Sequence, residues 1–538
     1  MSEVFNYHHQ TKHLPLRSAR SLGYMDWKNQ PNPFRIYEGA AAFDLPFRKK
    51  TGKNVFDNLF HPAPGGKESP TLAGIAHLLE YSLGLSAWKS YGNDAWSLRM
   101  NPSSGNLHPT EAHLVMPSID SMDAGVYHYD PYHHRLELRR VIPRELSKKL
   151  FSPFQGDGFF LILASIYWRE SWKYGERAFR YCQHDTGHAM AGIAFAAALS
   201  RWRCHAVNGV SDIEMRKLVG FDKTPWPPLE EENPAIVLHI HNSDDRSVRN
   251  FPDSVIEEIG ALDVHGEPNA LSPDRVDWPI IREAAEATRR PVTKDGNIVL
   301  PETPLLFPGL SSRDAEEVIR RRRSAQAFDN SGSMKAEVFF DLLDRTIPRA
   351  VAAPFDMHLS PTAMHLFIFV HRVEGVKPGL YVLLRNESDR EELRQSLSAS
   401  FTWDPAHDSL PLYLLEDGDF RDMARDLSCR QDIAGDSCFS LAMVGRFHSL
   451  VSAQPHLYRQ LFWEAGMVGQ VLYLTAEAHG FRGTGIGCYF DDAVHELLGL
   501  RDAEFQSFYH FTVGQPLDDR RLTTLPAYSH LRDGRVMP

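Results

Sequence analysis

Several features are scarce in this 538-residue sequence, and each scarcity excludes a class of protein. The longest apolar stretches, residues 158–168 and 189–199, fall far short of the roughly 20 residues that a membrane-spanning helix needs. Only five cysteines are present, an odd number without C-x-x-C spacing, which argues against structural zinc and for a reducing compartment. Lys and Arg number 58 against 69 Asp and Glu, so the net charge of −11 offers no basic surplus for nucleic acid. We expect a soluble, cytoplasmic protein without a membrane, nucleic-acid or metal partner.

Motifs of three common enzyme classes are missing as well. The sequence has no G-x-x-x-x-G-K-[ST], no H-E-x-x-H and no G-x-S-x-G, so ATPase, zinc-protease and α/β-hydrolase functions find no support. The composition is ordinary for a globular protein, with 43% hydrophobic, 24% charged and 11% aromatic residues. At roughly 100–200 residues per domain, the length suggests two to four domains.

An internal repeat organises the chain. Three segments recur 279 positions later: residues 179–181 as 458–460, Gly187 as Gly466, and residues 218–220 as 497–499. Asp212 matches Asp491 at the same offset. Earlier in each copy, residues 109–114 recur as residues 361–366, at an offset of 252. Two ordered matches indicate two copies of one domain.

The repeat predicts three segments: domain 1 at residues 1–240, a connector at 241–310 and domain 2 at 311–538. The connector holds eight of the 35 prolines, which disfavour helix interiors and central strands. We therefore expect it to be extended, with one short helix at residues 280–288. Domain 2 opens at residues 311–314 with a helix N-cap pattern.

Each copy mixes helical and strand periodicity. Residues 187–202 and 466–479 predict two long helices that are apolar nearly all round, as expected for helices buried at a domain centre. Strands are predicted at residues 112–116, 126–129, 236–240, 365–370, 380–384 and 508–513. Because helices and strands interleave without strict alternation, an α+β class is favoured over a doubly wound sheet.

Arg320 to Arg323, followed by Ser324, form the densest positive cluster of this acidic protein. One interpretation is a solvated helix end, whose cations suit the negative end of the helix dipole. The other is a phosphate site, because guanidinium groups bind a dianion in pairs of hydrogen bonds and a hydroxyl adds a neutral donor. The residues alone leave both interpretations open.

Two further segments combine small and polar residues. Residues 101–106 (N-P-S-S-G-N) are either a turn or a loop whose hydroxyls, amide and backbone face the edge of a planar heterocycle. Residues 483–487 (G-T-G-I-G) lack the strand-then-helix context of a dinucleotide fingerprint, so they predict either a tight turn or a backbone that approaches a ligand closely. Lys173 and Tyr174, just before the first long helix, can transfer protons if they are buried near a substrate, although an exposed Lys and a half-buried Tyr are commoner.

Taken together, these pieces resemble the flavin-dependent nitroreductase superfamily. Residues 322–324 with Phe328 resemble its FMN-phosphate motif, residues 102–106 its P-S-S-x-N loop, and residues 466–492 its flavin-covering segment. The resemblance implies an α+β fold with two tandem nitroreductase-like domains, each an antiparallel-containing sheet flanked by helices around a long buried helix. Nitroreductases are homodimers with FMN in the interface, so a tandem chain resembles such a dimer fused into one polypeptide.

More narrowly, four segments are similar to the SagB-like branch of that superfamily: residues 7–13, residues 30–34, residues 99–105 and residues 172–181. This branch includes azoline dehydrogenases, which form thiazoles and oxazoles in modified peptides. The resemblance thus implies a small-molecule or peptide substrate and, as a partner, a peptide-modifying enzyme complex.

The two copies do not keep the same parts of the motif set. In the repeat alignment, residues 102–106 correspond to Pro354–His358 and Arg99 to Val351, so domain 2 lacks the polar loop. Residues 483–487 correspond to Cys204–Asn208, so domain 1 lacks the glycines. Together the halves retain one composite flavin site, which predicts one FMN per chain and a functional monomer.

The resemblance assigns roles to the residues of this composite site. Arg322, Arg323 and Ser324 hold the phosphate, with Arg521 as a weaker candidate. The edge of the flavin ring faces Arg99, Pro102, Ser103, Ser104 and Asn106, and its N5 atom faces the backbone of Gly485, Ile486, Gly487 and Cys488. Lys173 is the base, provided that burial desolvates its ammonium, and Tyr174 orients it. We expect FMN-dependent oxidation of an azoline-like substrate. An NAD(P)H-dependent nitro- or quinone reductase and a catalytically silent docking scaffold are the alternatives.

Overall fold

The protein is described from a computed structural model, in which residues 2–48, 53–60, 68–245, 249–252, 254–292, 300–357, 359 and 362–531 are described. His358 and Pro361, which take part in the repeat alignment, lie outside these residues.

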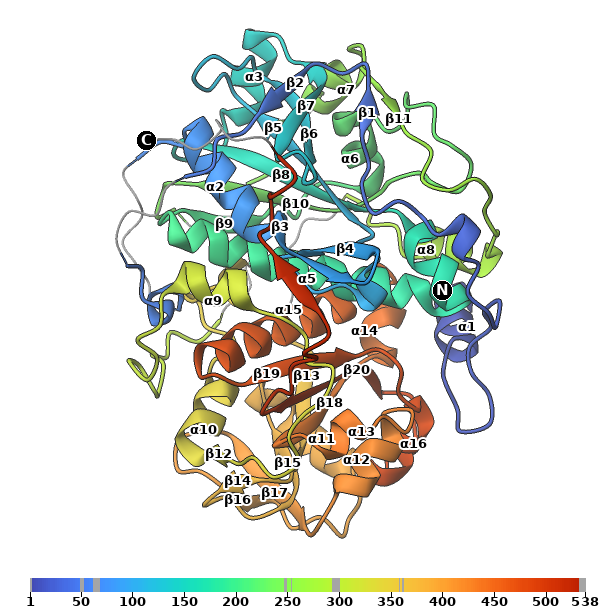
Figure 1. Cartoon of the computed structure of the whole chain (residues 1–538), viewed down its shortest axis with the longest axis vertical. Helices are drawn as coiled ribbons and strands as arrows, with labels where there is room; N and C mark the ends of the chain where they lie inside the picture. Colours follow the sequence, from blue (N-terminus) through green and yellow to red (C-terminus); the bar gives the residue numbers. More distant parts are fainter. Residues whose placement is uncertain are drawn as a thin grey trace.

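Two seven-stranded antiparallel sheets occupy opposite halves of the molecule, as Figure 1 shows. In the first sheet the order is β2 (Ala42–Asp44), β7 (Arg135–Val141), β6 (Gly125–Asp130), β5 (Thr110–Met116), β8 (Gly158–Ser165), β10 (Asn233–His241) and β9 (Arg203–Ala206). In the second it is β16 (Asp404–Pro405), β17 (Leu412–Asp417), β15 (Gly379–Leu383), β13 (Met364–Val370), β18 (Phe439–Arg446), β20 (Phe505–Gly514) and β19 (Arg482–Ile486). The matching strand order confirms two tandem domains of an α+β fold.

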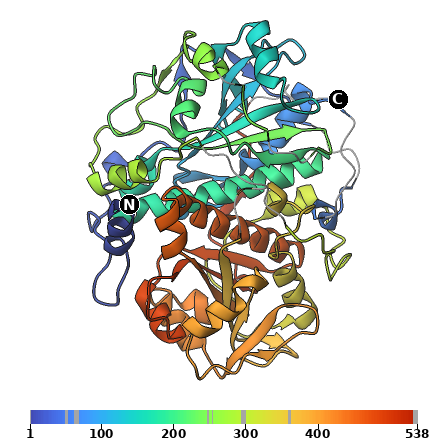
Figure 2. The same cartoon turned by 180° about the vertical axis from the view of Figure 1, so that it is seen from behind.

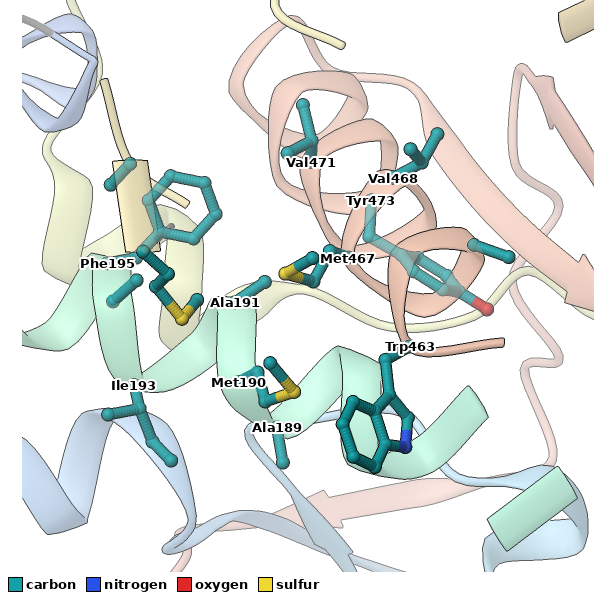
Figure 3. Close-up of a cluster of buried hydrophobic side chains, with 14 of the residues drawn as sticks. Ala189, Met190, Ala191, Ile193, Phe195, Trp463, Met467, Val468, Val471 and Tyr473 are labelled. Atoms are coloured by element: carbon teal, nitrogen blue, oxygen red, sulfur yellow. The ribbon is translucent and has the colours of Figure 1, made fainter. Parts of the chain in front are cut away.

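Two 22-residue helices lie between the sheets, α5 (Ala178–Leu199) and α15 (Leu457–Ala478), and they pack on each other at the centre of the molecule (Figures 1 and 2). Met190 and Met467 lie in their shared apolar core (Figure 3). Both helices begin nine residues before the predicted starts, because their first turns bury polar residues such as Arg180 and Arg459 beside the apolar ones, which obscures the apolar pattern.

The remaining helices lie around the sheets or in the connections between them (Figure 2). In the first half these are α1 (Ser2–Gln10), α2 (Leu72–Ser82), α3 (Arg144–Phe151), α4 (Tyr167–Tyr174) and α6 (Asp212–Val219). In the second they are α9 (Ala315–Arg321), α10 (Ala336–Asp344), α11 (Arg390–Ser396), α12 (Arg421–Leu427), α13 (Asp432–Gly435), α14 (His448–Ala453) and α16 (Asp491–Leu498). None of the described helices is long and apolar enough to cross a membrane.

The connector is more structured than the sequence predicts. Its helix α8 (Pro279–Ala287) lies where expected, but it also contains α7 (Val255–Gly260) and strand β11 (Glu267–Pro268), which pairs with β1 (Tyr37–Glu38). It therefore packs onto the first domain. Two more small sheets are formed, one by β12 (Met334–Lys335) with β14 (Val373–Glu374) and one by β21 (Thr523–Leu525), β3 (Leu85–Tyr91) and β4 (Asp94–Arg99). In the last of these, the end of the chain crosses back to the first half (Figure 1).

Buried ion pairs join the two halves in a repeat-related way. Arg180 of α5 pairs with Asp491 of the second half at 2.8 Å, and Arg459 of α15 pairs with Asp212 of the first half at 2.9 Å. These four residues are the equivalent positions of the sequence repeat. Arg177 adds a second contact to Asp491 at 3.0 Å, and together with Arg180 it holds the pKa of that carboxyl well below its ordinary value, although burial opposes this.

The cysteines do not behave as the odd count suggested. Cys429 and Cys488 form a disulfide with a Cα–Cα distance of 5.8 Å, and Cys182, Cys204 and Cys438 are free and buried. The inference of a reducing compartment is therefore not supported by the cysteine pattern. The two partners are 59 residues apart, and spacing alone could not reveal them.

Candidate functional site

The arginine cluster lies where helix α9 ends and the chain turns toward the first half. Asp314 caps the start of α9, and the chain leaves the helix at Arg322. Arg322 is buried and donates from Nη2 to the Arg99 carbonyl at 3.1 Å and from Nε to the Met100 carbonyl at 3.2 Å. The arginine of the second domain is thus fixed directly before the polar loop of the first.

Electrostatic interactions extend this cluster beyond the predicted residues. Burial and the neighbouring charge of Arg322 lower the pKa of Arg323 to about 10, and Arg482 acts in the same direction. Lys89 of β3 has a lowered pKa from burial and from the charges of Arg323 and Arg482. Sequence reasoning missed Lys89 and Arg482, which are distant in the chain. Asp518 pairs with Arg482 and also acts on Lys89, so the repulsion that favours an added anion is centred on Arg322 and Arg323.

Two other arginines are committed elsewhere. Arg320 hydrogen-bonds to Glu80 at 2.7 Å and to the Tyr81 hydroxyl at 2.6 Å. Arg521 is exposed and pairs with Asp519 at 2.7 Å. Its candidacy as a phosphate ligand loses support, because a local carboxylate already neutralises it.

Residues 483–486 of the G-T-G-I-G segment lie in the edge strand β19, and Gly487 follows directly after it, so the segment is not a tight turn. Side chains alternate along a strand, so Gly483, Gly485 and Gly487 share one face. An added Cβ on these glycines would lie 2.5 Å from the Phe511 ring, 1.9 Å from the Tyr509 hydroxyl and 2.2 Å from the Tyr181 ring, respectively. The glycines are therefore required by the aromatic side chains packed against this face.

A chain of hydroxyl contacts connects the arginine segment to β19. Ser324 is exposed, and its hydroxyl lies 2.9 Å from the hydroxyl of Tyr473 in α15. The Gly485 N–H donates to the same Tyr473 oxygen at 2.8 Å, so this amide is engaged within the protein. The Ala325 N–H donates to the Gly483 carbonyl at 3.1 Å. The phosphate segment and the glycine strand therefore form one unit. The Ile486 side chain is buried, and Cys488 lies just past the strand in the disulfide.

The Pro102–Asn106 loop faces this unit from the first half and contains a short 3-10 turn at Ser104–Asn106. Asn106 has φ near 60°, donates its amide to the Ser97 carbonyl at 2.9 Å and contacts His108 at 2.9 Å. The buried Arg99 guanidinium donates to the Pro33 carbonyl. Both side chains thus shape the loop from inside, and their contact with a ring edge stays a prediction. Pro102, Ser103 and Ser104 are partly exposed.

Lys173 and Tyr174 come from the end of α4 and meet this loop. An added Cβ on Gly105 would lie 2.8 Å from the Tyr174 hydroxyl and 3.2 Å from the Lys173 Cδ. Burial, followed by the charge of Glu170, raises the pKa of Tyr174 well above its ordinary value. Lys173 is exposed, so the expectation that burial desolvates its ammonium is wrong for the chain itself. The pair is nevertheless placed at the site.

The residues present fit an FMN group on two observations. The cluster of Arg322, Arg323, Arg482 and Lys89 suits a phosphate dianion, and Glu477 is the carboxyl that acts on its first two members. The Ser324 hydroxyl and the Ser103–Ser104 turn supply hydroxyls for a polar ring system, and Gly485 and Gly487 of the glycine segment are partly exposed.

The sequence repeat relates the composite site to an equivalent position in the molecule, formed by the counterparts of its residues, and that position is built differently. Arg290 of the connector donates there to Asn208, which stands at the position of Gly487, at 3.3 Å. Asp356 lines a space of only about 30 Å³ with Val351 and Cys204, the counterparts of Arg99 and Gly483. A larger cavity of about 890 Å³, which Arg290 also lines, combines Leu and Pro side chains with a majority of polar and charged ones, among them Arg349 and Arg385. Among the residues that the structure describes at this position, neither the serine turn at Ser103–Ser104 nor the glycine strand has an equivalent.

Comparisons with known proteins agree with this architecture. Residues 319–515 match the Nitroreductase family. The trifolitoxin-processing protein TfxB of Rhizobium leguminosarum is 28% identical over 223 residues, which cover 37% of this chain and 57% of TfxB, so the match spans little more than half of that relative. The "Putative nitroreductase MJ1384" of Methanocaldococcus jannaschii is 25% identical over 161 residues, covering 29% of this chain and 77% of that protein.

A crystal structure described as a putative nitroreductase from Anabaena variabilis superposes with a TM-score of 0.68 at 23% identity, covering 96% of this chain and 99% of that one. Because this likeness extends over both halves, the nitroreductase fold is not confined to the segment that the family match covers. Residues 319–515 of the chain therefore match the nitroreductase family, and the nitroreductase fold continues through both domains.

Proposed function

We propose that the chain is an FMN-dependent oxidoreductase of the SagB-like type, which oxidises a peptide-like or small heterocyclic substrate in an azoline-to-azole reaction. The observation that carries this proposal is the close approach of Lys173 and Tyr174 to Gly105 in the Pro102–Asn106 loop, called the serine loop below. A proton-transfer pair thereby meets the parts that suit a flavin.

The binding roles follow from the charges and donors of the site. Arg322 and Arg323, with Lys89 and Arg482 beside them, would hold the phosphate, and the Ser324 hydroxyl would add a neutral donor. The backbone of residues 485–488 and the Ser103–Ser104 turn would contact the ring system. When bound, FMN supplies the acceptor for the hydride that leaves the substrate.

The protein's own chemistry is the removal of a proton. In a dehydrogenation the substrate loses a hydride and a proton from adjacent atoms, and Lys173 would take the proton as general base. The Tyr174 phenol stays protonated at neutral pH because of its raised pKa, so it can donate a hydrogen bond that orients the substrate or Lys173. A bound substrate would cover the exposed Lys173 and so desolvate it.

The name of one relative supports a substrate that is itself processed, since TfxB is a trifolitoxin-processing protein. We extend this to a partner: a peptide-modifying enzyme complex. The chain itself would act as a monomer, because its two halves already form the interface that two subunits would otherwise provide.

One observation favours a second candidate, an NAD(P)H-dependent nitro- or quinone reductase. The exposed Lys173 is the arrangement expected if that residue does no proton transfer. The two functions are separated by mixing the FMN-loaded protein anaerobically with an azoline-containing peptide or with NADPH and recording the flavin absorbance. Bleaching by the peptide alone supports the dehydrogenase. Rapid bleaching by NADPH alone supports the reductase.

A further inference from the structure

Two carboxyl groups that the sequence analysis did not single out lie beside the serine loop. Glu170 of α4 and Asp185 of α5 are 0% and 4% exposed. The Ser103 hydroxyl lies 3.5 Å from Glu170 Oε1 and also interacts with the Asp185 carboxyl. The Ser104 N–H donates to Asp185 Oδ1 at 3.3 Å. The two acids thus meet at one turn and share its donors.

The hydrogen atoms available at this turn are too few for two carboxylates. The Ser103 oxygen already accepts from the His108 N–H at 2.8 Å, and its single hydroxyl hydrogen can be donated only once. Glu170 Oε2 and Asp185 Oδ2 are buried without a hydrogen-bond partner among the described residues. Two buried anions with unsatisfied oxygens are costly, whereas a proton on one carboxyl removes a charge and supplies a donor.

The electrostatic environment acts in the same direction. Burial, and next the charge of Asp185, raises the pKa of Glu170 well above its ordinary value, while Lys173 one helical turn later on α4 opposes this rise. Burial raises the pKa of Asp185 to about 7, against hydrogen bonds from Ser103 and Ser104. Of the two acids, Glu170 therefore keeps its proton and Asp185 titrates near neutrality.

Titratable groups from every packed element face the two acids. The Asp185 charge acts on Tyr174 of α4, Cys182 of α5, Tyr473 of α15 and Tyr509 of β20. Burial raises the pKa of each of these four groups, so all of them are neutral at pH 7. Lys173 is the cation that acts on Glu170.

We propose that Glu170 and Asp185 form a carboxyl pair that holds one shared proton at neutral pH and accepts a second one during substrate oxidation. This rests on the proposed function, in which Lys173 takes the proton that leaves the substrate carbon. Lys173 then passes this proton to the pair, whose charge changes from −1 to 0, and the hydride from the substrate goes to FMN. The proton later returns to solvent through the exposed Lys173. Glu170 and Asp185 are positioning residues, since they act through Ser103 and Lys173.

Infrared spectroscopy of the full chain tests the shared proton without any turnover. Glu170→Gln and Asp185→Asn preserve the side-chain shapes, and Glu176→Gln is a matched control, because that carboxyl faces the exposed Arg20 at 3.3 Å. Wild type and the control should show the C=O stretch of a protonated carboxyl at pH 8, with a further titration near pH 7. Glu170→Gln should remove the band at pH 8, and Asp185→Asn should abolish the titration. An unchanged spectrum in both variants would overturn the proposal.

The pH dependence of the flavin midpoint potential tests the proton-accepting role independently of substrate. Above pH 7, reduction of the FMN-loaded wild type and of Glu176→Gln should take up one proton more than reduction of Asp185→Asn. Equal proton uptake in all proteins contradicts the role, even where the infrared band is present. If the chain binds no flavin, the proposed function fails together with the proton-accepting role. The infrared result then still decides whether the pair holds a proton.

Discussion

Gly187 and Gly466 face each other where α5 crosses α15, with the Gly187 Cα only 3.0 Å from the position that a Cβ on Gly466 would take. The two glycines are equivalent positions of the sequence repeat. A Cβ on Gly187 would lie 2.2 Å from the Trp463 carbonyl oxygen, and one on Gly466 would lie 2.3 Å from that of His184. The two domains therefore approach one another at backbone contact distance, and this contact fixes α5 with Asp185 relative to α15 with Tyr473.

Gly466→Ala should destabilise the protein strongly. The new methyl group meets backbone, which cannot turn away as a side chain would, and overpacking of this kind costs about 1–3 kcal/mol or more. The midpoint of urea unfolding measures the effect. Gly260→Ala is the control, since its added Cβ would lie 3.3 Å from the Lys217 Cβ and 3.7 Å from the Lys217 carbonyl oxygen, distances without a severe overlap. Equal midpoints for the two variants would show that the helix crossing is loosely packed.

Arg322→Ala combined with Arg323→Ala should abolish FMN retention. Each charge-assisted hydrogen bond contributes about 1.5–3 kcal/mol, so losing two weakens binding by roughly 10²–10⁴-fold. Fluorescence titration with FMN measures the change, and a melting curve verifies that the variant folds. Arg521→Ala serves as the control, because that arginine is exposed and paired with Asp519. A double variant that purifies with full flavin would refute the phosphate assignment.

Lys173→Ala should leave FMN bound and reducible by dithionite but should lower kcat for substrate oxidation by about 10²–10⁴-fold, the usual contribution of a positioned base. Lys173→Arg should not restore activity, because guanidinium stays protonated. Tyr174→Phe should lose less if the phenol only orients. Lys148→Ala, at an exposed lysine paired with Glu145, is the control. Near-wild-type turnover in all the Lys173 and Tyr174 variants would favour the reductase.

Asp185→Asn should stabilise the protein at pH 8 but not at pH 4. The pKa of Asp185 is about 7 in the folded chain against 3.8 ordinarily. The protonated Asp185 therefore contributes fully to the free energy of unfolding below about pH 4, and this contribution is lost as the pH rises through 7. Asparagine carries no charge at either pH, so the free energy of unfolding of the variant should exceed that of wild type at pH 8 by at most about 4 kcal/mol. Urea unfolding at both pH values measures it. A difference that does not change with pH would show that Asp185 has an ordinary pKa.

Sequence reasoning predicted those features that depend on local pattern. The strands, the two long helices and the repeat follow from periodic burial and from matched positions such as Arg180 and Arg459, and they are found in the structure. The Gly483–Gly487 segment was predicted to be either a tight turn or a backbone that approaches a ligand closely, and neither interpretation predicted a strand, although the period-2 spacing of its glycines is itself a strand signal.

Features that arise only from folding could not be predicted. Whether Lys173 is buried depends on neighbours far away in the sequence. Arg521 is neutralised by Asp519, and the sequence does not reveal the local geometry that brings these two side chains together. Glu170 and Asp185 are 15 residues apart on two helices, and only the fold brings both to Ser103. The Cys429–Cys488 disulfide has the same origin.

The central claim is that the two halves build one composite flavin site, and the flavin-to-protein ratio tests it most directly. Purified protein is saturated with FMN, freed of excess ligand and denatured by heat, and the released flavin is quantified against protein. The account predicts a ratio near one, because the serine turn and the glycine strand occur once in the described part of the chain, and Arg290 and Asp356 lie at the equivalent position of the other half. A ratio near two would contradict the asymmetry of the halves, and a ratio near zero would contradict the flavin site itself.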